Sequence, residues 1–144
     1  MAENIKFPSK VVIDASVVLA LLLPDERNKP KAVSFLQQYE QGGVNLISTQ
    51  LLNFEVLNGI RTAVLRKRIK SETAKKLVNS FLGLEIKKEE INFSRAFEYS
   101  LDFSISVYDA SYLALAKKKD CPLVTSDKKL FQKTKRKFKD IILF

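Results

Sequence analysis

Short apolar segments alternate with helical patterns along this chain, and this alternation is the strongest constraint on its fold. Residues 11–14, 44–47, 122–125 and 141–143 are short and carry valine, isoleucine or leucine, as buried strands do. Each of the first three is followed by a segment with helical periodicity. Strands that alternate with helices predict βαβ units and a mainly parallel sheet. A length of 144 residues predicts one α/β domain, spanning residues 1–144.

Seven helices are expected between and after these strands. We place them at residues 16–23, 30–41, 50–67, 71–82, 90–102, 107–119 and 126–134, with a minor strand at 84–86. The glycine pair at 42–43 is expected to end the second helix. Ser48 with Thr49, Ser71 and Ser106 are expected to cap the third, fourth and sixth helices, because serine and threonine are favoured at helix N-termini.

The amino-acid composition excludes several kinds of chemistry. The chain has no histidine, which removes Ser-His-Asp and Cys-His nucleophilic schemes and histidine-ligated zinc. The single cysteine, Cys121, allows neither an internal disulfide nor a cysteine-rich metal site. Any hydrolytic activity must therefore come from carboxylates, from a hard metal ion, or from both.

Charge is unevenly spread along the chain. The net charge is +9; residues 1–60 sum to −1, and residues 61–144 to +10. A basic half predicts an anionic partner, with nucleic acid as the leading candidate, although a solvated lysine-rich surface explains the charge equally well. The longest apolar run, residues 17–23, is far shorter than a membrane span, and the first ten residues lack an apolar targeting segment. We expect a cytoplasmic protein without membrane contact.

Four carboxylates are placed where chemistry is expected in a parallel sheet. Asp14 and Asp127 directly follow predicted strands, Asp109 opens a predicted helix, and Glu55 lies near the start of another. The carboxyl ends of parallel strands, and the helix N-termini that follow them, meet at one edge of the sheet. Carboxylates gathered there repel one another, and a divalent cation such as Mg²⁺ or Mn²⁺ would relieve the repulsion. Such an ion can activate water for attack on a phosphate.

Each of these acids also has a structural explanation. Asp14, Asp109 and Asp127 are all in positions that suit helix capping, and a cap does not exclude a role in a site. Glu55 forms a polar stripe with Asn58 and Thr62 that would simply face water. The helix around Glu55 is apolar over most of its circumference, however, which favours a site role for this residue.

Further residues are candidates for supporting the acidic cluster. Thr125 and Ser16 can hydrogen-bond a metal-bound water or a phosphate oxygen, and Asn58 is expected to orient Glu55. Basic side chains are expected to line the approach and to hold a nucleic-acid backbone by charge. They are Arg61, Arg66, Lys67 and Lys128, with Arg68, Lys129 and residues 117–119 as further members.

Four segments taken together resemble the PIN domain family, and within it the VapC-type toxins of toxin–antitoxin pairs. They are Val-Ile-Asp-Ala-Ser at 12–16, Glu-Val-Leu-Asn at 55–58, Val-Tyr-Asp-Ala-Ser-Tyr-Leu-Ala-Leu-Ala at 107–116, and Leu-Val-Thr-Ser-Asp-Lys-Lys-Leu at 123–130. The order and spacing of the four segments carry the resemblance, which runs from about residue 10 to residue 144. The chain departs from the family in its very basic segment 117–139.

The resemblance implies a three-layer α/β/α sandwich with a small parallel sheet. It implies an endoribonuclease dependent on Mg²⁺ or Mn²⁺, with Asp14 and Asp109 as principal metal ligands, Glu55 and Asp127 completing the site, and Thr125 supporting it. Cleavage would be hydrolytic and would leave a 5′-phosphate and a 3′-hydroxyl. The resemblance further implies a homodimer and a small antitoxin partner. Phe35, Leu36 and Tyr39 are a candidate surface for one of these associations.

Two other classes of function are weighed against this one. A different metal-dependent phosphoryl-transfer enzyme is disfavoured: a phosphatase of the haloacid-dehalogenase type has a second aspartate where this chain has Ser16, and a receiver domain has an acidic pair that is missing here. A non-catalytic RNA- or partner-binding module on the same fold is the main alternative. The presence of all four acids favours the enzyme.

Overall fold

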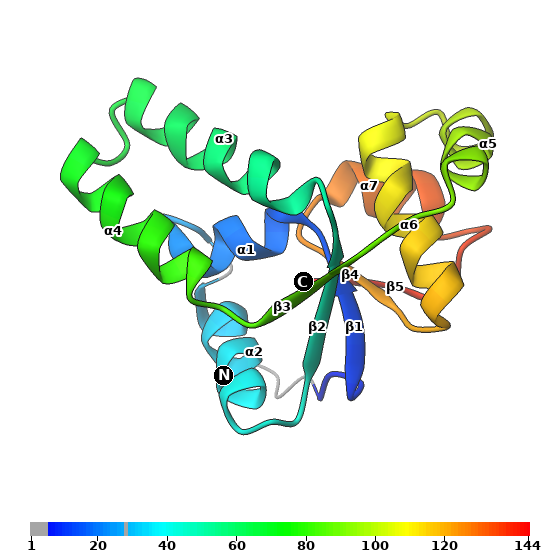
Figure 1. Ribbon diagram of the computed structural model, residues 1–144, viewed down its shortest axis with the longest axis horizontal. Coiled ribbons are helices and arrows are strands. Elements are labelled where there is room, and N and C mark those ends of the chain that lie inside the picture. The colour runs from blue at the N-terminus through cyan, green and yellow to red at the C-terminus, as the bar shows by residue number, and fades with distance from the viewer. Residues whose placement is uncertain (1–5, 28) are drawn as a thin grey trace.

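The computed structural model describes residues 6–27 and 29–144, and these residues form a five-stranded sheet flanked by helices (Figure 1). In sheet order the strands are β3 (Ile86–Glu89), β2 (Asn45–Thr49), β1 (Lys10–Ile13), β4 (Leu123–Thr125) and β5 (Ile141–Leu143). Every neighbouring pair is parallel. The mainly parallel sheet expected from the sequence is confirmed.

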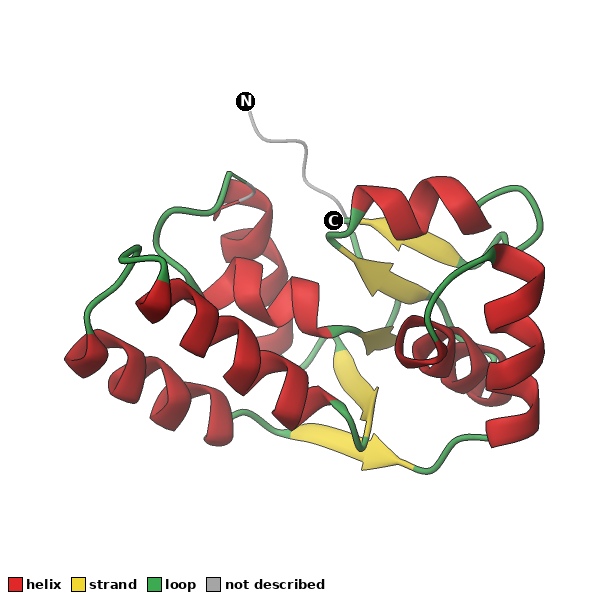
Figure 2. Ribbon diagram, turned by 90° about the horizontal axis from the view of Figure 1, so that it is seen from above, coloured by secondary structure: helices red, strands yellow, loops and turns green. Residues whose placement is uncertain are grey.

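The helices form a layer on each face of the sheet (Figures 1 and 2). One layer contains α1 (Ala15–Leu22), α2 (Lys29–Glu40), α3 (Leu52–Leu65) and α4 (Ser71–Leu82). The other contains α5 (Phe93–Phe103), α6 (Val107–Lys119) and α7 (Lys128–Thr134). The three-layer sandwich implied by the resemblance is therefore present. In the part of the chain that the structure describes, none of the helices combines the length and hydropathy that a membrane span requires.

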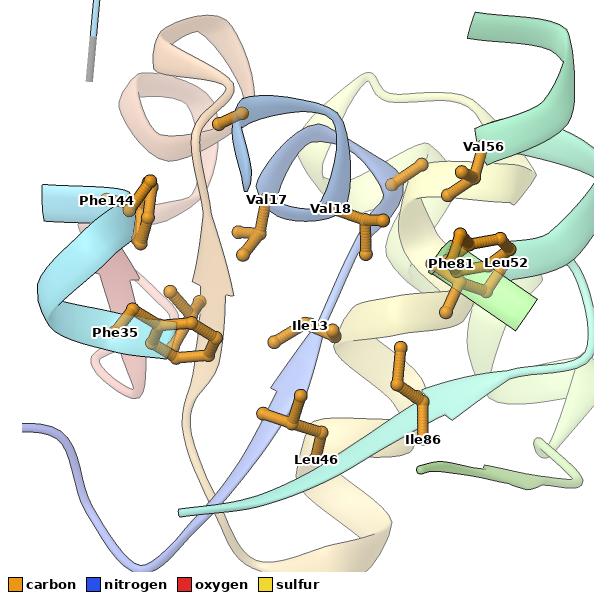
Figure 3. Close-up of a cluster of buried hydrophobic side chains, with 14 of the residues drawn as sticks. Ile13, Val17, Val18, Phe35, Leu46, Leu52, Val56, Phe81, Ile86 and Phe144 are labelled. Carbon is orange, nitrogen blue, oxygen red and sulfur yellow. The ribbon is translucent and has the colours of Figure 1, made fainter. Parts of the chain in front are cut away.

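Strand β1 connects the two layers because successive side chains of a strand point to opposite faces. Val11 and Ile13 contribute to the core beneath α1–α4, whereas Val12 contributes to the core beneath α5–α7. Figure 3 shows Ile13 in the first of these cores, surrounded by labelled side chains from the sheet and the covering helices. Burial on both faces explains why this segment is an unbroken apolar run rather than an alternating one.

Several predicted element ends move in the structure. The minor strand is β3, at Ile86–Glu89 rather than 84–86, and α5 starts at Phe93 rather than at 90. Helix α5 starts later because Asn92 caps it, with its side-chain oxygen accepting a hydrogen bond from the Arg95 amide (3.0 Å). The predicted bounds of α4, α6 and β5 coincide with those observed.

The predicted cap is right for Ser106 and wrong for Ser48 and Ser71, while the hydroxyl of Thr49 accepts a hydrogen bond from the Leu51 amide (3.2 Å) just before α3. Ser106 caps α6, and its hydroxyl accepts a hydrogen bond from the Asp109 amide (3.0 Å). Ser48 instead donates its hydroxyl to the carbonyl of Ile13 (2.7 Å), which ties β2 to β1. Ser71 is the first residue of α4 and makes no capping hydrogen bond, because the cap position is occupied by Lys70.

The predicted exposure of Phe35 in the association surface on α2 is wrong, whereas Leu36 and Tyr39 are half-buried. Phe35 is fully buried, with its ring 4.8 Å from that of Phe7 and 5.6 Å from that of Phe144, measured between centroids. The hydroxyl of Tyr39 accepts a hydrogen bond from the Glu85 amide (2.8 Å). These two aromatic side chains therefore hold α2 against the rest of the domain: Phe35 packs in the core, and Tyr39 accepts a hydrogen bond.

Gly42 is expected to be required at the end of α2, as the sequence predicted for the glycine pair. Its φ angle is +75°, and the amide of the following Gly43 donates to the carbonyl of Gln38 (2.9 Å). An added Cβ at Gly42 would meet no atom within 4 Å, so only backbone strain opposes alanine there. We expect Gly42→Ala to lower the free energy of unfolding by about 1 kcal/mol in a urea titration.

The matched control for Gly42→Ala is Gly83→Ala at the end of α4. Gly83 has a φ of −82°, which any residue adopts, and the nearest atom to an added Cβ is 3.5 Å away. The free energy of unfolding of Gly83→Ala should stay within about 0.5 kcal/mol of the wild-type value, and a small increase is also consistent with the argument. Equal losses at the two glycines would contradict the strain argument.

Candidate active site

Three of the predicted acids cap or open helices at the carboxyl edge of the sheet. Asp14 is the N-cap of α1 and accepts a hydrogen bond from the Val17 amide (3.3 Å). Asp127 is the N-cap of α7 and accepts one from the Leu130 amide (3.1 Å). Asp109 lies in the first turn of α6. The structural explanation for these residues is thus correct, and it also places their carboxylates at one edge.

Asp14 is held by two hydroxyl groups. Only 5% of this residue is exposed. Its Oδ1 accepts a hydrogen bond from Ser16 Oγ, and its Oδ2 accepts one from Thr125 Oγ1, each at 2.5 Å. Both residues predicted to support the site therefore contact its most buried acid.

The same hydroxyls connect Asp14 to the loop between β4 and α7. Ser16 Oγ accepts a hydrogen bond from the Ser126 amide (2.8 Å), and Thr125 Oγ1 accepts one from the Asp127 amide (3.1 Å). The segment that carries Asp127 is thereby fixed relative to Asp14. Residues far apart in sequence are held in one hydrogen-bonded unit.

Glu55 is oriented by a residue that the sequence did not suggest. Its Oε1 accepts a hydrogen bond from the buried phenol of Tyr112 at 2.5 Å. Tyr112 follows Asp109 by three residues on α6, so the two share one face of the helix. This spacing would have placed Tyr112 beside the acidic site, although it does not reveal the bond to Glu55.

Asn58, predicted to orient Glu55, lies exposed on α3. Its carbonyl accepts a hydrogen bond from the hydroxyl of Thr62 (2.9 Å), which is a bond within the helix. The contact to Glu55 that the sequence assigned to Asn58 is made by Tyr112 instead.

Electrostatic repulsion connects all four acids through Asp109. Burial raises the pKa of Asp14 to about 6, and the charge of Asp109 raises it further against the opposing hydroxyl hydrogen bonds. Burial also raises the pKa of Glu55, again with a contribution from Asp109. The pKa of Asp109 is itself raised by burial and by the charge of Asp127. Asp109 therefore lies close enough to Asp14, Glu55 and Asp127 to interact with each of them by charge.

The donor atoms of this cluster suit a hard divalent cation. Carboxylate and hydroxyl oxygens are the ligands that Mg²⁺ and Mn²⁺ prefer, and Mg²⁺ commonly uses one or two carboxylates and keeps several waters. Within residues 6–27 and 29–144, no three Asp, Glu, Cys or His side chains converge as a closed metal-binding group. The chemistry of the donors thus fits a cation held by few protein ligands.

The predicted basic residues differ in their distance from the cluster. Lys128 is exposed and directly follows Asp127, whereas Arg61 lies midway along α3. Arg66 and Lys67 lie at the far end of α3, roughly 16 Å beyond Glu55 along the helix axis. Proximity to the acids thus favours Lys128 over the arginines of α3.

Other basic residues are engaged elsewhere. Residues 117–119 occupy the last turn of α6, at the opposite end from Asp109, so they do not line the approach. Arg68 forms an ion pair with Asp25 (2.7 Å) and a longer one with Glu26 (3.3 Å). Lys133 lies nearer: its Nζ donates to the carbonyl of Ser104 (2.9 Å), and its charge lowers the pKa of Asp109.

Tyr112→Phe is expected to raise the pKa of Glu55 still further. The phenol lowers this pKa by donating to the carboxylate, and phenylalanine removes that donor while keeping the ring. The free energy of unfolding should fall by about 1–3 kcal/mol, the typical contribution of a hydrogen bond to a charged group. A ¹³C NMR titration of the Glu55 carboxyl, with urea unfolding beside it, measures both effects. An unchanged titration curve would show that Tyr112 does not control Glu55.

The parallel sheet and the acids at its carboxyl edge define an α/β protein with polar side chains at the strand ends, where such folds carry their sites. The family model of the PIN domain matches residues 11–137, and the chain belongs to the PIN domain family. The resemblance noted in the sequence is confirmed.

Individual relatives agree with this assignment. Ribonuclease VapC3 of Pyrobaculum aerophilum is 31% identical over 124 residues, which cover 86% of this chain and 94% of that protein. The crystal structure of PAE2754 from the same organism superposes with a TM-score of 0.61 at 22% identity, covering 89% and 88% of the two chains. Mycobacterium tuberculosis VapC20, a sarcin–ricin loop cleaving toxin, gives 0.61 at 15% identity, covering 86% and 95%. The two structures show that the fold is shared.

Proposed function

We propose that this PIN domain is a metal-dependent endoribonuclease of the VapC toxin type, and that residues 1–144 act as one domain. The observation that carries the proposal is the placement of Asp14, Asp109 and Asp127 at helix starts on one edge of the sheet, where the hydroxyl of Thr125 joins Asp14 to the amide of Asp127. Relatives named as VapC ribonucleases support it. PIN-domain ribonucleases generally depend on a metal, and we propose Mg²⁺ or Mn²⁺ because every donor in the cluster is an oxygen.

The four acids would have different roles in binding the cation. Asp14 and Asp109 would be the principal ligands, and Glu55 and Asp127 would complete the site. When bound, the ion would lower the pKa of a coordinated water and offset the charge on the scissile phosphate, so that hydrolysis leaves a 5′-phosphate and a 3′-hydroxyl.

The surrounding residues would keep the acids in place before substrate arrives. Ser16 and Thr125 hold one oxygen each of Asp14, which fixes the plane of its carboxylate. Tyr112 fixes Glu55 in the same way. Such preorganisation avoids rearrangement of charged groups during the reaction. Lys128 would hold the RNA backbone beside Asp127, with Arg61, Arg66 and Lys67 engaging a longer RNA along α3.

We further propose the associations that the family resemblance implies. The chain would form a homodimer in the cytoplasm, and a small antitoxin protein would inhibit it. Light scattering of the purified chain, alone and with the product of a neighbouring gene, measures both associations. A monomer at micromolar concentration would contradict the first of them.

The test of the proposed function is cleavage of a mixed cellular RNA pool by the purified protein. Cleavage should appear with Mg²⁺ or Mn²⁺, stop in EDTA, and yield fragments whose 5′-phosphates permit direct ligation. RNA binding without cleavage, in protein of verified fold and free of antitoxin, would contradict the enzyme and support the non-catalytic binding module instead.

A further inference from the structure

One exposed lysine of α7 is held by the turn that leads into α6. Lys133 lies in the last turn of α7, and its Nζ donates a hydrogen bond to the carbonyl of Ser104 (2.9 Å). Ser104 ends α5, and Ser106, two residues later, caps α6. The bond therefore joins α7, which begins after Asp127, to the turn that places Asp109.

The ammonium group of Lys133 is close enough to the acidic cluster to act on it by charge. Burial and the charge of Asp127 raise the pKa of Asp109, and the charge of Lys133 lowers it. Lys128 and Lys129 are nearer to Asp127 along the chain, but among the described residues neither makes a hydrogen bond or an ion pair. Lys133 is thus the lysine of α7 that the structure both holds in place and sets near the acids.

A lysine at the end of a helix can simply cap it, but this explanation accounts for only part of the arrangement. A cation near a helix C-terminus is stabilised by the helix dipole. The end of α5 is already closed by the backbone, because the amides of Ser104 and Ile105 both donate to the carbonyl of Ser100. Lys133 adds one bond to a turn that is closed without it, and its position near Asp109 calls for a second role.

The ammonium group of Lys133 keeps two donors for a ligand. A lysine ammonium has three N–H donors and no acceptor. In the part of the chain that the structure describes, Lys133 makes one hydrogen bond, to Ser104, and no ion pair. A neutral carbonyl fixes the nitrogen without neutralising its charge. The remaining donors and the charge together suit a phosphate oxygen, because charge-assisted hydrogen bonds are the strong ones.

The surroundings of Lys133 favour a polyanion over a small free anion. Asp109 lies nearby, and its negative charge repels a single anion that approaches the ammonium group. A nucleic-acid strand carries many phosphates, and the net charge of +9 attracts the strand as a whole. One of its phosphates can then meet Lys133 without being bound by that lysine alone.

We propose that Lys133 binds a backbone phosphate of the RNA strand beside the acidic cluster, on the side of Asp109. This inference rests on the proposed ribonuclease function and adds a substrate-binding residue that the sequence did not single out. The bond to Ser104 would hold the ammonium group in place before the strand arrives. Binding would then cost less entropy than the ordering of a fully mobile lysine side chain.

The test is the salt dependence of RNA binding in EDTA, where the protein does not cleave the strand. The probe is a fluorescently labelled uridine dodecamer, titrated with protein at several salt concentrations between about 50 and 200 mM. Loss of one phosphate contact lowers the slope of log affinity against log salt by roughly 0.7 for a single strand. Lys133→Met should show this smaller slope and should bind roughly 5- to 30-fold more weakly at the lowest salt concentration. An adenosine dodecamer should lose the same factor, because a phosphate contact does not read the base.

Two variants control this experiment. Lys118→Met removes the same charge from another exposed lysine whose Nζ donates to a backbone carbonyl, that of Glu90 (3.0 Å), at the opposite end of α6 from Asp109. It should keep the wild-type slope. Lys133→Arg retains the charge and should keep most of the slope and the affinity. A purely structural role of Lys133 would change thermal unfolding and leave the salt slope as it is.

Three results would overturn the inference. A wild-type slope in Lys133→Met would show that the lysine only supports the turn. Equal loss of slope in Lys133→Met and Lys118→Met would show that net charge alone controls binding. A wild type that does not bind the strand would remove the contact altogether. In each case metal-dependent cleavage of the RNA pool by the wild type would leave the proposed function standing, whereas absence of that cleavage would remove the function itself.

Discussion

Asp109→Asn is expected to reduce the rate of RNA cleavage by roughly 10³-fold, because several kcal/mol of transition-state stabilisation depend on the cation that the cluster holds. The charge of Asp109 raises the pKa of Asp14 and of Glu55, and the charge of Asp127 raises the pKa of Asp109 itself. Asparagine has nearly the same shape, and the cap bond from the backbone amide of residue 109 to the hydroxyl of Ser106 does not involve the carboxylate and would remain. The variant should therefore lose cleavage activity and keep its fold, as measured by circular dichroism.

The matched control for this variant is Asp102→Asn. Asp102 is an exposed aspartate of α5 that lies outside the cluster. Its replacement changes the net charge of the protein by the same amount but should leave cleavage within about twofold of the wild-type rate. Equal losses in the two variants would mean that net charge, and not the cluster, controls activity.

The second large expected effect concerns pH. The free energy of unfolding of the metal-free protein should rise as the pH falls from about 7.5 to 5. The pKa of Asp14 is about 6 in the folded protein, against a usual value of 3.8. A raised folded pKa means that the folded state binds the proton more tightly than the unfolded chain does. Ionised Asp14 destabilises the folded state by about 3 kcal/mol. This destabilisation is fully present above pH 6 and disappears as the pH falls toward 4.

Other acids do not reverse this trend within the same window. The pKa values of Glu55 and Asp109 are also raised, chiefly by burial, so they act in the same direction. The pKa values of Asp25 and Glu89 are lowered, mainly by hydrogen bonds from Arg68 and Lys119. Stabilisation from these two is lost only as pH falls below about 4.5, outside the window.

Asp14→Asn isolates the contribution of Asp14. In EDTA at pH 7.5 the variant should unfold at a temperature roughly 5–10 °C above the wild type, and most of the pH dependence should vanish. Added Mn²⁺ should raise the unfolding temperature of the wild type and leave the variant almost unchanged. Thermal unfolding followed by circular dichroism measures the unfolding temperature, its pH dependence and its response to Mn²⁺. A variant that is less stable than wild type at pH 7.5 would show that ionised Asp14 stabilises the fold.

Local sequence patterns predicted most of the sheet because the strands other than β3 are marked by apolar composition. Residues 11–13 are all apolar, with no alternation of apolar and polar residues. This pattern is typical of a strand that is buried on both faces. Helix α6 was predicted with its observed ends because Ser106 caps it and the chain breaks the pattern after Lys119. The start of α5 moved because its cap, Asn92, was not identified as one from the sequence.

The sequence located the acids but not all of their partners. Caps follow strands in a parallel sheet, so the same local pattern predicted both the helix starts and the cluster. The bond between Glu55 and Tyr112 joins residues 57 positions apart, and no local pattern contains it. Phe35 was assigned to an exposed face for the same reason: its burial depends on Phe7 and Phe144, at opposite ends of the chain.

The central claim is that Asp14, Glu55, Asp109 and Asp127 form one cation site, and calorimetric titration of Mn²⁺ into metal-free protein at pH 7.5 tests it most directly. The wild type should bind the ion at a specific site, and Asp109→Asn should bind it at least tenfold more weakly, while Asp102→Asn binds like the wild type. Equal affinity in the wild type and Asp109→Asn would contradict the claim, because the cation would then be held somewhere other than the cluster.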